Sequence, residues 1–386
     1  MAGAPTTPET ITVADGNLTI QQNSSGAVAI GIADGTIQIT KQPAHGRIRV
    51  RGLNATYRSI HPLFSGTDSF DYTITKNGVT SNEATVNDTV TALASGASTH
   101  TETYAGGAFQ LNGWNTYTSA AGQTTNSIFE FRNGTYNGTP TTMRRMAVYG
   151  DNASYAGDTL YNSLFGALPV DGAAGAMKDW PWKADLIQIP ECGVDATLSF
   201  KISQNNGKIP LVALLLNYDI EKTENNRYEM TGYHVFLNNG GGSATLSRFD
   251  QADELATSYL DRWPNTNYGN EAMANPVASG PYKGWNYKNG VWPAGGNLGI
   301  GGPLHLAVRY QYDVNTGNTT ISYEARQPNG TDLTPGTWDI VVQLTGADSL
   351  TPGGGFGIMP VNYHTDSMLL ETDIDVAEFK VQCSLP

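Results

Sequence analysis

The chain has 386 residues, more than one typical domain, with 44 Gly, 19 Pro and 15% charged residues. Helical bundles and coiled coils are rich in Glu, Lys and Leu, so this composition excludes them and indicates many short strands joined by tight turns. The formal charge of −13 argues against nucleic acid as a partner, because phosphate would be repelled. The longest aliphatic run, residues 211–216, is far shorter than the about 20 residues that span a bilayer, so we expect no membrane insertion.

The first residues, 1–8, contain neither the basic region nor the apolar stretch of a signal peptide. We therefore expect a protein that is not exported through the general secretory route. The alternative is a secreted protein whose signal has been removed.

Residues 10–90 show β-branched alternation broken by Gly, Asn and Asp, a pattern typical of short strands. Asp34-Gly35 and Asn77-Gly78 are hairpin-turn signals. The expected strands cover residues 10–13, 18–20, 27–32, 36–40, 48–50, 70–74 and 84–86. Their number and spacing predict an antiparallel sandwich of immunoglobulin-like size, to which we assign residues 1–92.

Three features of this region resemble the bacterial cadherin-like and immunoglobulin-like repeat family. They are the Gln42-Pro-Ala-His-Gly46 turn, Tyr57, and the run Phe64-Ser-Gly-Thr-Asp-Ser-Phe-Asp-Tyr72. Repeats of that family act as spacers or decorations in bacterial adhesins and phage virion proteins. The resemblance therefore implies display on a surface rather than a reaction.

Inside the run 64–72, each residue type has an expected physical role. Phe64, Phe70 and Tyr72 are expected to fill the core of the sandwich. Gly66 permits the turn, and Asp68 can cap it through its carboxylate.

Residues 93–105 are small and polar and have no apolar periodicity, so we expect a linker there. Residues 106–386 are expected to form one large β-domain. Its predicted strands cover residues 128–132, 145–149, 186–189, 196–202, 210–217, 233–237, 304–312, 319–325, 338–344 and 374–382. One helix is predicted over residues 250–263, with Asp250 as its N-cap and an acidic first turn.

The last 90 residues resemble the concanavalin A-like jelly roll of legume-type lectins, laminin-G-type modules and related glucanases. The resemblance rests on strands at 304–312 and 319–325, a turn at 313–318, a glycine-rich return at 353–358 and a closing strand at 373–381. The expected fold class is therefore all-β, an immunoglobulin/cadherin-like sandwich followed by a concanavalin A-like jelly roll.

A carboxylate cluster lies on the closing strand, at Glu371, Asp373, Asp375 and Glu378. The apolar parity shifts by one within it, which predicts a β-bulge near Ala377 and places all four acids on one polar face. The strand resembles the Glu-x-Asp-x-x-Glu strand of laminarinase-type glucanases, which share the jelly roll. A retaining glycosidase needs two such carboxylates about 5 Å apart. Here, however, an Asp stands at 373 where the nucleophilic Glu should be.

Asp373 and Glu378 are therefore the candidates for catalysis, against the alternative of a solvated outer face with or without a bound cation. We expect that alternative, and hence a protein that is not an enzyme. No other catalytic signature is present in the sequence.

Metal binding has few candidates. His234 and His305 lie inside strand patterns and are expected to be structural. Residues 151–158 and 313–318 offer the oxygen ligands that calcium prefers, but their spacing is not that of an EF-hand, so Asx turns are the expected explanation. We expect no metal or cofactor, with calcium left open at these loops.

Cys192 and Cys383 are the only cysteines of the chain. We expect them to lie near one another in the jelly roll. If the protein matures in a reducing cytoplasm, both should be free thiols.

The candidate ligand-binding residues are concentrated in residues 263–292, which hold three of the seven tryptophans beside several Tyr, Asn and Gly. Flat aromatic faces with nearby amides suit neutral sugars, which stack their C–H faces and hydrogen-bond through hydroxyls. The alternatives are packing against the sandwich or a contact between subunits of a homo-oligomer. The candidates are Trp263, Tyr268, Trp285, Tyr287 and Trp292, with Trp180 and Trp182 as a smaller second group.

Together these observations predict a non-enzymatic protein on the surface of a phage virion, as a capsid decoration, head fibre or tail-associated adhesin. Its expected partners are glycans and the capsid or tail proteins of the particle, and it would be assembled in the host cytoplasm. One alternative is an extracellular or cell-surface adhesin of a bacterium. The other is a glycan-cleaving enzyme of the laminarinase-like class.

Overall fold

The computed structural model describes residues 10–118, 127–148, 183–204, 211–222, 228–238, 243–253, 282–287, 304–326, 340–360, 363–365, 368–370 and 372–386. These residues form strands and three short 3-10 turns, Ala105–Gly107, Pro190–Cys192 and Gly346–Asp348, so the fold is all-β. Within these ranges no helix has the length and apolar character needed to cross a membrane. The chain forms two compact units, one of residues up to Ser95 with Thr351–Gly353 and one of the remaining residues.

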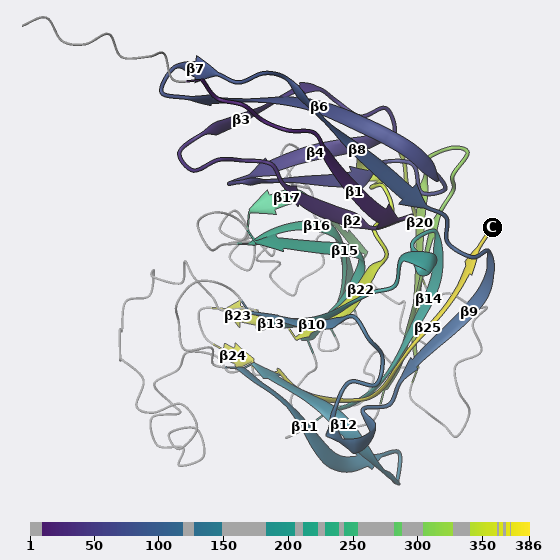
Figure 1. Cartoon of the computed structure of the whole chain (residues 1–386). Coiled ribbons are helices and arrows are strands. Elements are labelled where there is room, and N and C mark those ends of the chain that lie inside the picture. The colour runs from purple at the N-terminus through teal and green to yellow at the C-terminus, as the bar shows by residue number, and fades with distance from the viewer. Residues whose placement is uncertain are drawn as a thin grey trace, which may run out of the picture. The chain divides into compact units, whose positions relative to one another are not determined.

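The first unit is built from two sheets, in which all strand pairs are antiparallel except the parallel pair β1–β8 (Figure 1). One sheet has the order β1-β8-β6-β3, with the short β7 beside β6, and the other has the order β2-β5-β4. The strands are β1 (Gly16–Gln21), β2 (Ser25–Ala29), β3 (Thr36–Lys41), β4 (Gly46–Arg51), β5 (Asn54–Ser59), β6 (Gly66–Lys76), β7 (Val79–Thr80) and β8 (Ala84–Thr91).

Alternating side chains from both sheets make the core of the first unit. Phe70, Tyr72 and Ile74 of β6 are buried, and so are Val86 and Val90 of β8. Full burial of each such side chain stabilises the fold by roughly 1.5–3 kcal/mol. The sequence prediction that Phe70 and Tyr72 fill the core is therefore confirmed.

Asp68 fastens the turn before β4 to the start of β6. Its carboxylate accepts hydrogen bonds from the backbone N–H groups of Ala44 (2.9 Å), His45 (2.8 Å) and Ser69 (2.9 Å), and from the Tyr57 hydroxyl (3.1 Å). Burial alone would raise the pKa of Asp68, but these hydrogen bonds outweigh it and hold the pKa below its usual value. Asp68 therefore caps a turn, but it is the turn of the Gln42–Gly46 motif and not the predicted one at Gly66.

Gly46 is required by the same arrangement. A Cβ atom at this position would lie 2.1 Å from Cε2 of the Tyr57 ring, a distance that no side chain can adopt. The glycine of the Gln42–Gly46 motif thus makes room for the tyrosine that bonds Asp68.

The second unit contains two large antiparallel sheets (Figure 1). The seven-stranded sheet has the order β10-β13-β22-β15-β16-β17-β18. Its strands are β10 (Trp114–Thr118), β13 (Lys183–Gln188), β15 (Leu211–Lys222), β16 (Tyr228–Asn238), β17 (Ser243–Asp253), β18 (Tyr282–Tyr287) and β22 (Gly355–Pro360).

The eight-stranded sheet has the order β11-β12-β25-β14-β19-β20-β21, with β9 paired to β25. Its strands are β9 (Gly96–Glu102), β11 (Ser127–Tyr136), β12 (Thr139–Val148), β14 (Asp195–Gln204), β19 (Leu304–Tyr312), β20 (Thr319–Arg326), β21 (Ile340–Leu344) and β25 (Thr372–Leu385). A small hairpin, β23 (Tyr363–Thr365) and β24 (Met368–Leu370), stands apart from both sheets. Side chains from the two large sheets share one core, for example Phe200 of β14 with Leu214 and Leu216 of β15.

The predicted linker over residues 93–105 is wrong for most of its length. Gly96–Glu102 is strand β9, and the buried Glu102 carboxylate accepts N–H hydrogen bonds from Tyr104 (2.8 Å), Gln110 (2.7 Å) and Leu111 (3.0 Å). The segment is polar because β9 pairs only with β25 among the described strands and leaves most of its side chains exposed. Polarity there marks an edge strand, not a linker.

The predicted helix over residues 250–263 is also wrong at its start. Residues up to Asp253 belong to β17, where Glu229 pairs with Asp253 and Met230 with Ala252. Residues 254–263 lie outside the described residues. Asp250 and Asp253, which would suit the first turn of a helix, instead lie in the last residues of strand β17.

Candidate functional site

The aromatic candidates fall largely outside the part of the chain that the structure describes. Trp263, Tyr268 and Trp292 lie outside the described residues, and so do Trp180 and Trp182. Trp285 and Tyr287 lie on β18, the edge strand of the seven-stranded sheet. Of residues 263–292 the structure therefore places only residues 282–287, at the end of that sheet as far as the described strands extend.

The register of β18 locates its two aromatic positions. Trp285 pairs with Leu246, which in turn pairs with Val235, and both neighbours belong to the core of the second unit. Tyr287 pairs with Ala244, two positions further along the same parity. In the backbone register, Trp285 thus stands opposite a core residue.

The carboxylate candidates lie on β25, and the predicted bulge is present. Lys201 of β14 pairs with Glu378 and Ile202 pairs with Val376, which leaves Ala377 as the extra residue. Asp373 pairs with Ala147 in the backbone register.

Both described acids of the cluster have cationic partners. The Arg132 guanidinium donates to the two carboxylate oxygens of Asp375, with Nε 2.8 Å from Oδ1, and Lys201 Nζ lies 3.1 Å from Glu378. Asp375 is 2% exposed, and the Arg132 guanidinium supplies the hydrogen-bond partner that a buried carboxyl group needs.

These two ion pairs belong to a larger pattern on the eight-stranded sheet. Arg145 of β12 lies 3.1 Å from Glu130 of β11, and Arg309 of β19 lies 2.8 Å from Asp195 of β14. Opposite charges on neighbouring strands stabilise a sheet by roughly 0.2–1 kcal/mol per pair. Lys201–Glu378, Arg145–Glu130 and Arg309–Asp195 join neighbouring strands in this way, whereas Arg132 of β11 reaches Asp375 of β25 across β12. The prediction that Asp375 lies on a solvated outer face is wrong, because its side chain is buried.

The calcium candidate at residues 313–318 is an Asx turn. The Asp313 carboxylate accepts hydrogen bonds from the N–H of Asn315 (2.9 Å) and the hydroxyl of Thr316 (2.8 Å), and these bonds lower the pKa of Asp313. The turn interpretation is confirmed for this loop, while residues 151–158 lie outside the described residues.

The two strand histidines are buried, in line with a structural role. His234 is fully buried on β16, with Nε2 2.7 Å from the Tyr218 hydroxyl, and burial lowers the pKa of His234 to about 3. A neutral imidazole is thus kept between the rings of Tyr218 and Phe249. His305 of β19 is 5% exposed.

A buried charge pair between the two large sheets is a feature that the sequence analysis missed. Arg144 of β12 donates from Nε to Asp185 of β13 at 2.7 Å, and Thr116 of β10 donates to the same carboxylate at 2.6 Å. The guanidinium also lies over the Phe131 ring, 4.6 Å from its centroid. The arrangement joins the two large sheets through side chains of β12, β13 and β10.

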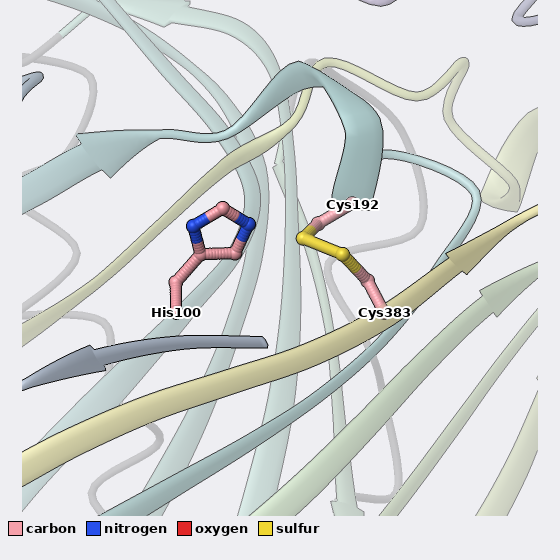
Figure 2. A group of neighbouring side chains, drawn as sticks. All are labelled: His100, Cys192 and Cys383. Carbon is pink, nitrogen blue, oxygen red and sulfur yellow. A yellow bond between two sulfur atoms is a disulfide. The ribbon is translucent and has the colours of Figure 1, made fainter. Parts of the chain in front are cut away.

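Cys192 and Cys383 form a disulfide (Figure 2). The prediction that they lie close together is confirmed, because Cys192 ends the 3-10 turn before β14 and Cys383 pairs with Ala196 at the start of that strand. The expectation of free thiols is wrong. It rested on the redox state of an assumed compartment, whereas the geometry permits a direct cross-link.

His100 of β9 lies beside the disulfide, with its imidazole facing the sulfur atoms (Figure 2). Its Nε2 is 3.2 Å from the Ser98 hydroxyl and 3.2 Å from a Glu191 carboxylate oxygen. Neither His100 nor Glu191 was a sequence candidate, because their closeness depends on β9 pairing with β25.

Comparisons with known proteins give no family. No protein-family model matches the chain, and no curated protein matches it. One matching solved structure is of botulinum neurotoxin type C, which depends on interaction with two ganglioside molecules to enter cells.

That match has 10% sequence identity and a TM-score of 0.26. It covers 68% of this chain and 49% of the solved chain, so this protein spans about half the length of the structure it matches. A score that low carries no argument about fold or function.

Proposed function

We propose that the chain is a non-enzymatic surface protein of a phage virion that binds glycans through residues 263–292. The observation that carries the proposal is that this tryptophan- and amide-rich segment is attached to the sheet at an edge strand, β18. Among the described strands β18 pairs with β17 alone, and segments that adjoin the edge of a sheet are a common place for binding residues.

The chemistry of the segment is the second support. Trp263, Tyr268 and Trp292 flank β18 in the sequence, and Asn265, Asn267 and others lie between them. Aromatic faces stack on the C–H faces of neutral sugars, and amides bond the hydroxyls. The acidic charge of the chain disfavours strongly anionic polysaccharides as the ligand.

The virion placement rests on the first unit and on the disulfide. The first unit, with its Gln42–Gly46 turn fastened by Asp68, suits a spacer between a particle and a binding unit. A buried disulfide persists in an oxidising environment, which a particle meets after it leaves the host cell. Capsid or tail proteins would be its partners on the particle, and a bacterial surface adhesin is the alternative.

The glycan proposal is tested with the full chain on a glycan array, with melting temperature measured on the same variants. Trp263→Ala and Trp292→Ala are expected to weaken binding by about 1–3 kcal/mol, with the melting temperature nearly unchanged. Trp114→Ala is the matched control, because Trp114 stacks on Phe109 with centroids 5.0 Å apart and packs against the core. It should lower stability without changing the glycan profile.

Trp285→Ala separates binding from packing. A role in packing, which the register with Leu246 favours, predicts a loss of about 3–5 kcal/mol in stability. A role in binding predicts weaker glycan retention at unchanged stability. An array without any bound glycan would overturn the glycan proposal, and absence of immunogold label on intact particles would overturn the virion placement.

A further inference from the structure

Three segments that are distant in the sequence bring two sulfur atoms and an imidazole together in the second unit. His100 comes from β9, Cys192 from the 3-10 turn Pro190–Cys192, and Cys383 from β25, and their ligand atoms all lie within 4.8 Å of one another. Figure 2 shows the imidazole beside the disulfide. Among the described residues this is the one group of three potential ligands so closely spaced.

The surroundings of the cluster are polar on the histidine side. Glu191 Oε1 lies 3.2 Å from His100 Nε2, and the Ser98 hydroxyl lies 3.0 Å from Cys383 Sγ. Cys192 is fully buried, while the side chains of His100 and Glu191 are 25% and 33% exposed. The side of the cluster formed by His100 and Glu191 is therefore its more exposed side.

We propose that reduction of the Cys192–Cys383 disulfide turns this cluster into a zinc site. Cys192, Cys383 and His100 would be three ligands and Glu191 the fourth. The proposal stands apart from glycan binding and needs no residue of segment 263–292.

The observed spacing suits a tetrahedral ion. With Zn–N and Zn–O bonds of about 2.0–2.1 Å, a tetrahedron places a nitrogen and an oxygen ligand about 3.3 Å apart. His100 Nε2 and Glu191 Oε1 are already 3.2 Å apart. Two sulfur ligands at about 2.3 Å from zinc stand about 3.8 Å apart, a separation that the sulfurs can reach once their bond is broken.

The chemistry of the ligands selects the metal. Two thiolates and an imidazole are soft to borderline donors, which favour Zn²⁺ over Ca²⁺ or Mg²⁺. The Ser98 hydroxyl can donate to the Cys383 thiolate and so help hold it deprotonated.

The redox step balances with a thiol as the reductant. Two small-molecule thiols give up two electrons and two protons and form their own disulfide, while the Cys192–Cys383 bond is reduced to two thiols. Binding of Zn²⁺ then releases the two thiol protons as the metal–sulfur bonds form. After loss of the metal, exchange with a small-molecule disulfide restores the Cys192–Cys383 bond: the two cysteine thiols give up two electrons and two protons, and the small-molecule disulfide becomes two thiols.

The oxidised and the zinc-bound states would link β9, the 3-10 turn and β25 to different extents. The disulfide joins two of the three segments, whereas the metal would join all three. The chain would thus have a cross-link between the 3-10 turn and β25 both in a reducing cytoplasm and outside the cell.

The test uses the full chain, reduced with a phosphine that takes an oxygen atom from water and becomes the phosphine oxide. After removal of the phosphine under nitrogen, Co²⁺ is added as a spectroscopic probe and then displaced by Zn²⁺. We expect one Co²⁺ per chain, with the thiolate-to-cobalt charge-transfer band and the visible absorption of tetrahedral cobalt. The oxidised protein should show neither.

His100→Ala should weaken cobalt and zinc affinity by about tenfold or more, as loss of a ligand or its support typically does. His61→Ala, an exposed histidine of the first unit, is the matched control and should leave affinity unchanged. Zn²⁺ should also raise the melting temperature of the reduced protein and not that of the oxidised protein.

Three results would overturn the proposal. They are absence of the cobalt spectrum in the reduced chain, equal affinity in the parent and His100→Ala, and a reduced chain that loses its near-ultraviolet circular dichroism and does not regain it with Zn²⁺. The last measurement separates a missing site from a failure of the chain to fold.

Discussion

The two units of this protein each bury a carboxyl group completely, and they treat it in opposite ways. Asp185 in the second unit is bonded by Arg144 and Thr116. Asp88 in the first unit is 0% exposed, and neither of its carboxyl oxygens has a hydrogen-bond partner among the described residues. The same chemical group is thus ionic and paired in one core and unpaired in the other.

The position of Asp88 explains its state. It follows Ala84 and Val86 and precedes Val90 on the inward face of β8, and in the register it stands opposite Asp68 of β6. Burial, with a smaller contribution from the charge of Asp68, raises the pKa of Asp88 to about 7. The first unit therefore accommodates its acid by keeping the proton, and the second unit by supplying a cation.

The largest expected change in stability comes from breaking the Arg144–Asp185 pair. Arg144→Met leaves the buried Asp185 without its cation and should lower the free energy of unfolding of the second unit by about 3–5 kcal/mol. Urea denaturation of the full chain, followed by tryptophan fluorescence, measures this change. The double variant Arg144→Met/Asp185→Leu should recover much of the loss, and a single variant within about 1 kcal/mol of the parent would contradict the role of the pair.

The unpaired acid should make the first unit dependent on pH. Below pH 3.8 both folded and unfolded chains carry protonated Asp88, so its contribution to stability is greatest there. Between 3.8 and about 7 only the unfolded chain ionises, and the unit loses stability as pH rises. At about 1.4 kcal/mol per pH unit, this loss amounts to about 4 kcal/mol at most and then stops.

Hydrogen exchange of peptides covering β6 and β8 in the full chain follows the stability of this unit alone. Asp88→Val, which extends the Val86 and Val90 pattern, should stabilise the unit at pH 8 and remove the loss between pH 4 and pH 7. Asp71→Asn, a change at a partly exposed acid of β6, is the matched control and should keep that loss. If Asp88→Val retained the full pH dependence, another group would have to carry it.

The smallest effect is expected at the outer ion pairs, where water competes for both charges. Glu378→Gln should change stability by about 1 kcal/mol or less, because the Lys201 and Glu378 side chains are 21% and 25% exposed. The parent is expected to release no reducing ends from a panel of β-glucans, and Glu378→Gln is expected to behave in the same way. Any release that depends on Glu378 would favour the glucanase alternative.

Local patterns made part of this fold predictable from the sequence. The strand expected at residues 304–312 is β19 with the same bounds, and the parity shift at Ala377 correctly gave the bulge. Asn77 and Gly78 both adopt positive φ in the turn between β6 and β7, as an Asn-Gly turn requires. In each case the signal lies within a few neighbouring residues.

The rest depended on contacts between distant segments. The sequence around Arg144 and around Asp185 has no local pattern that predicts their contact, because the two residues come from different sheets. The sequence of β9 predicts a linker, because it shows no apolar alternation, and His100 lies near the cysteines through that strand. Asp88 is different, because its place in the alternation of Ala84, Val86 and Val90 was visible in the sequence and could have been found.

One feature of the first unit has a mechanical consequence. Its first strand, β1, runs parallel to its last strand, β8, with residues 16–21 paired to residues 86–91. Because the strands are parallel, the chain enters at one end of this ladder and leaves at the opposite end. Tension along the chain would therefore slide β1 past β8 and strain all the hydrogen bonds between them at once, rather than opening them one after another. The first unit is therefore expected to resist pulling through this pair of strands.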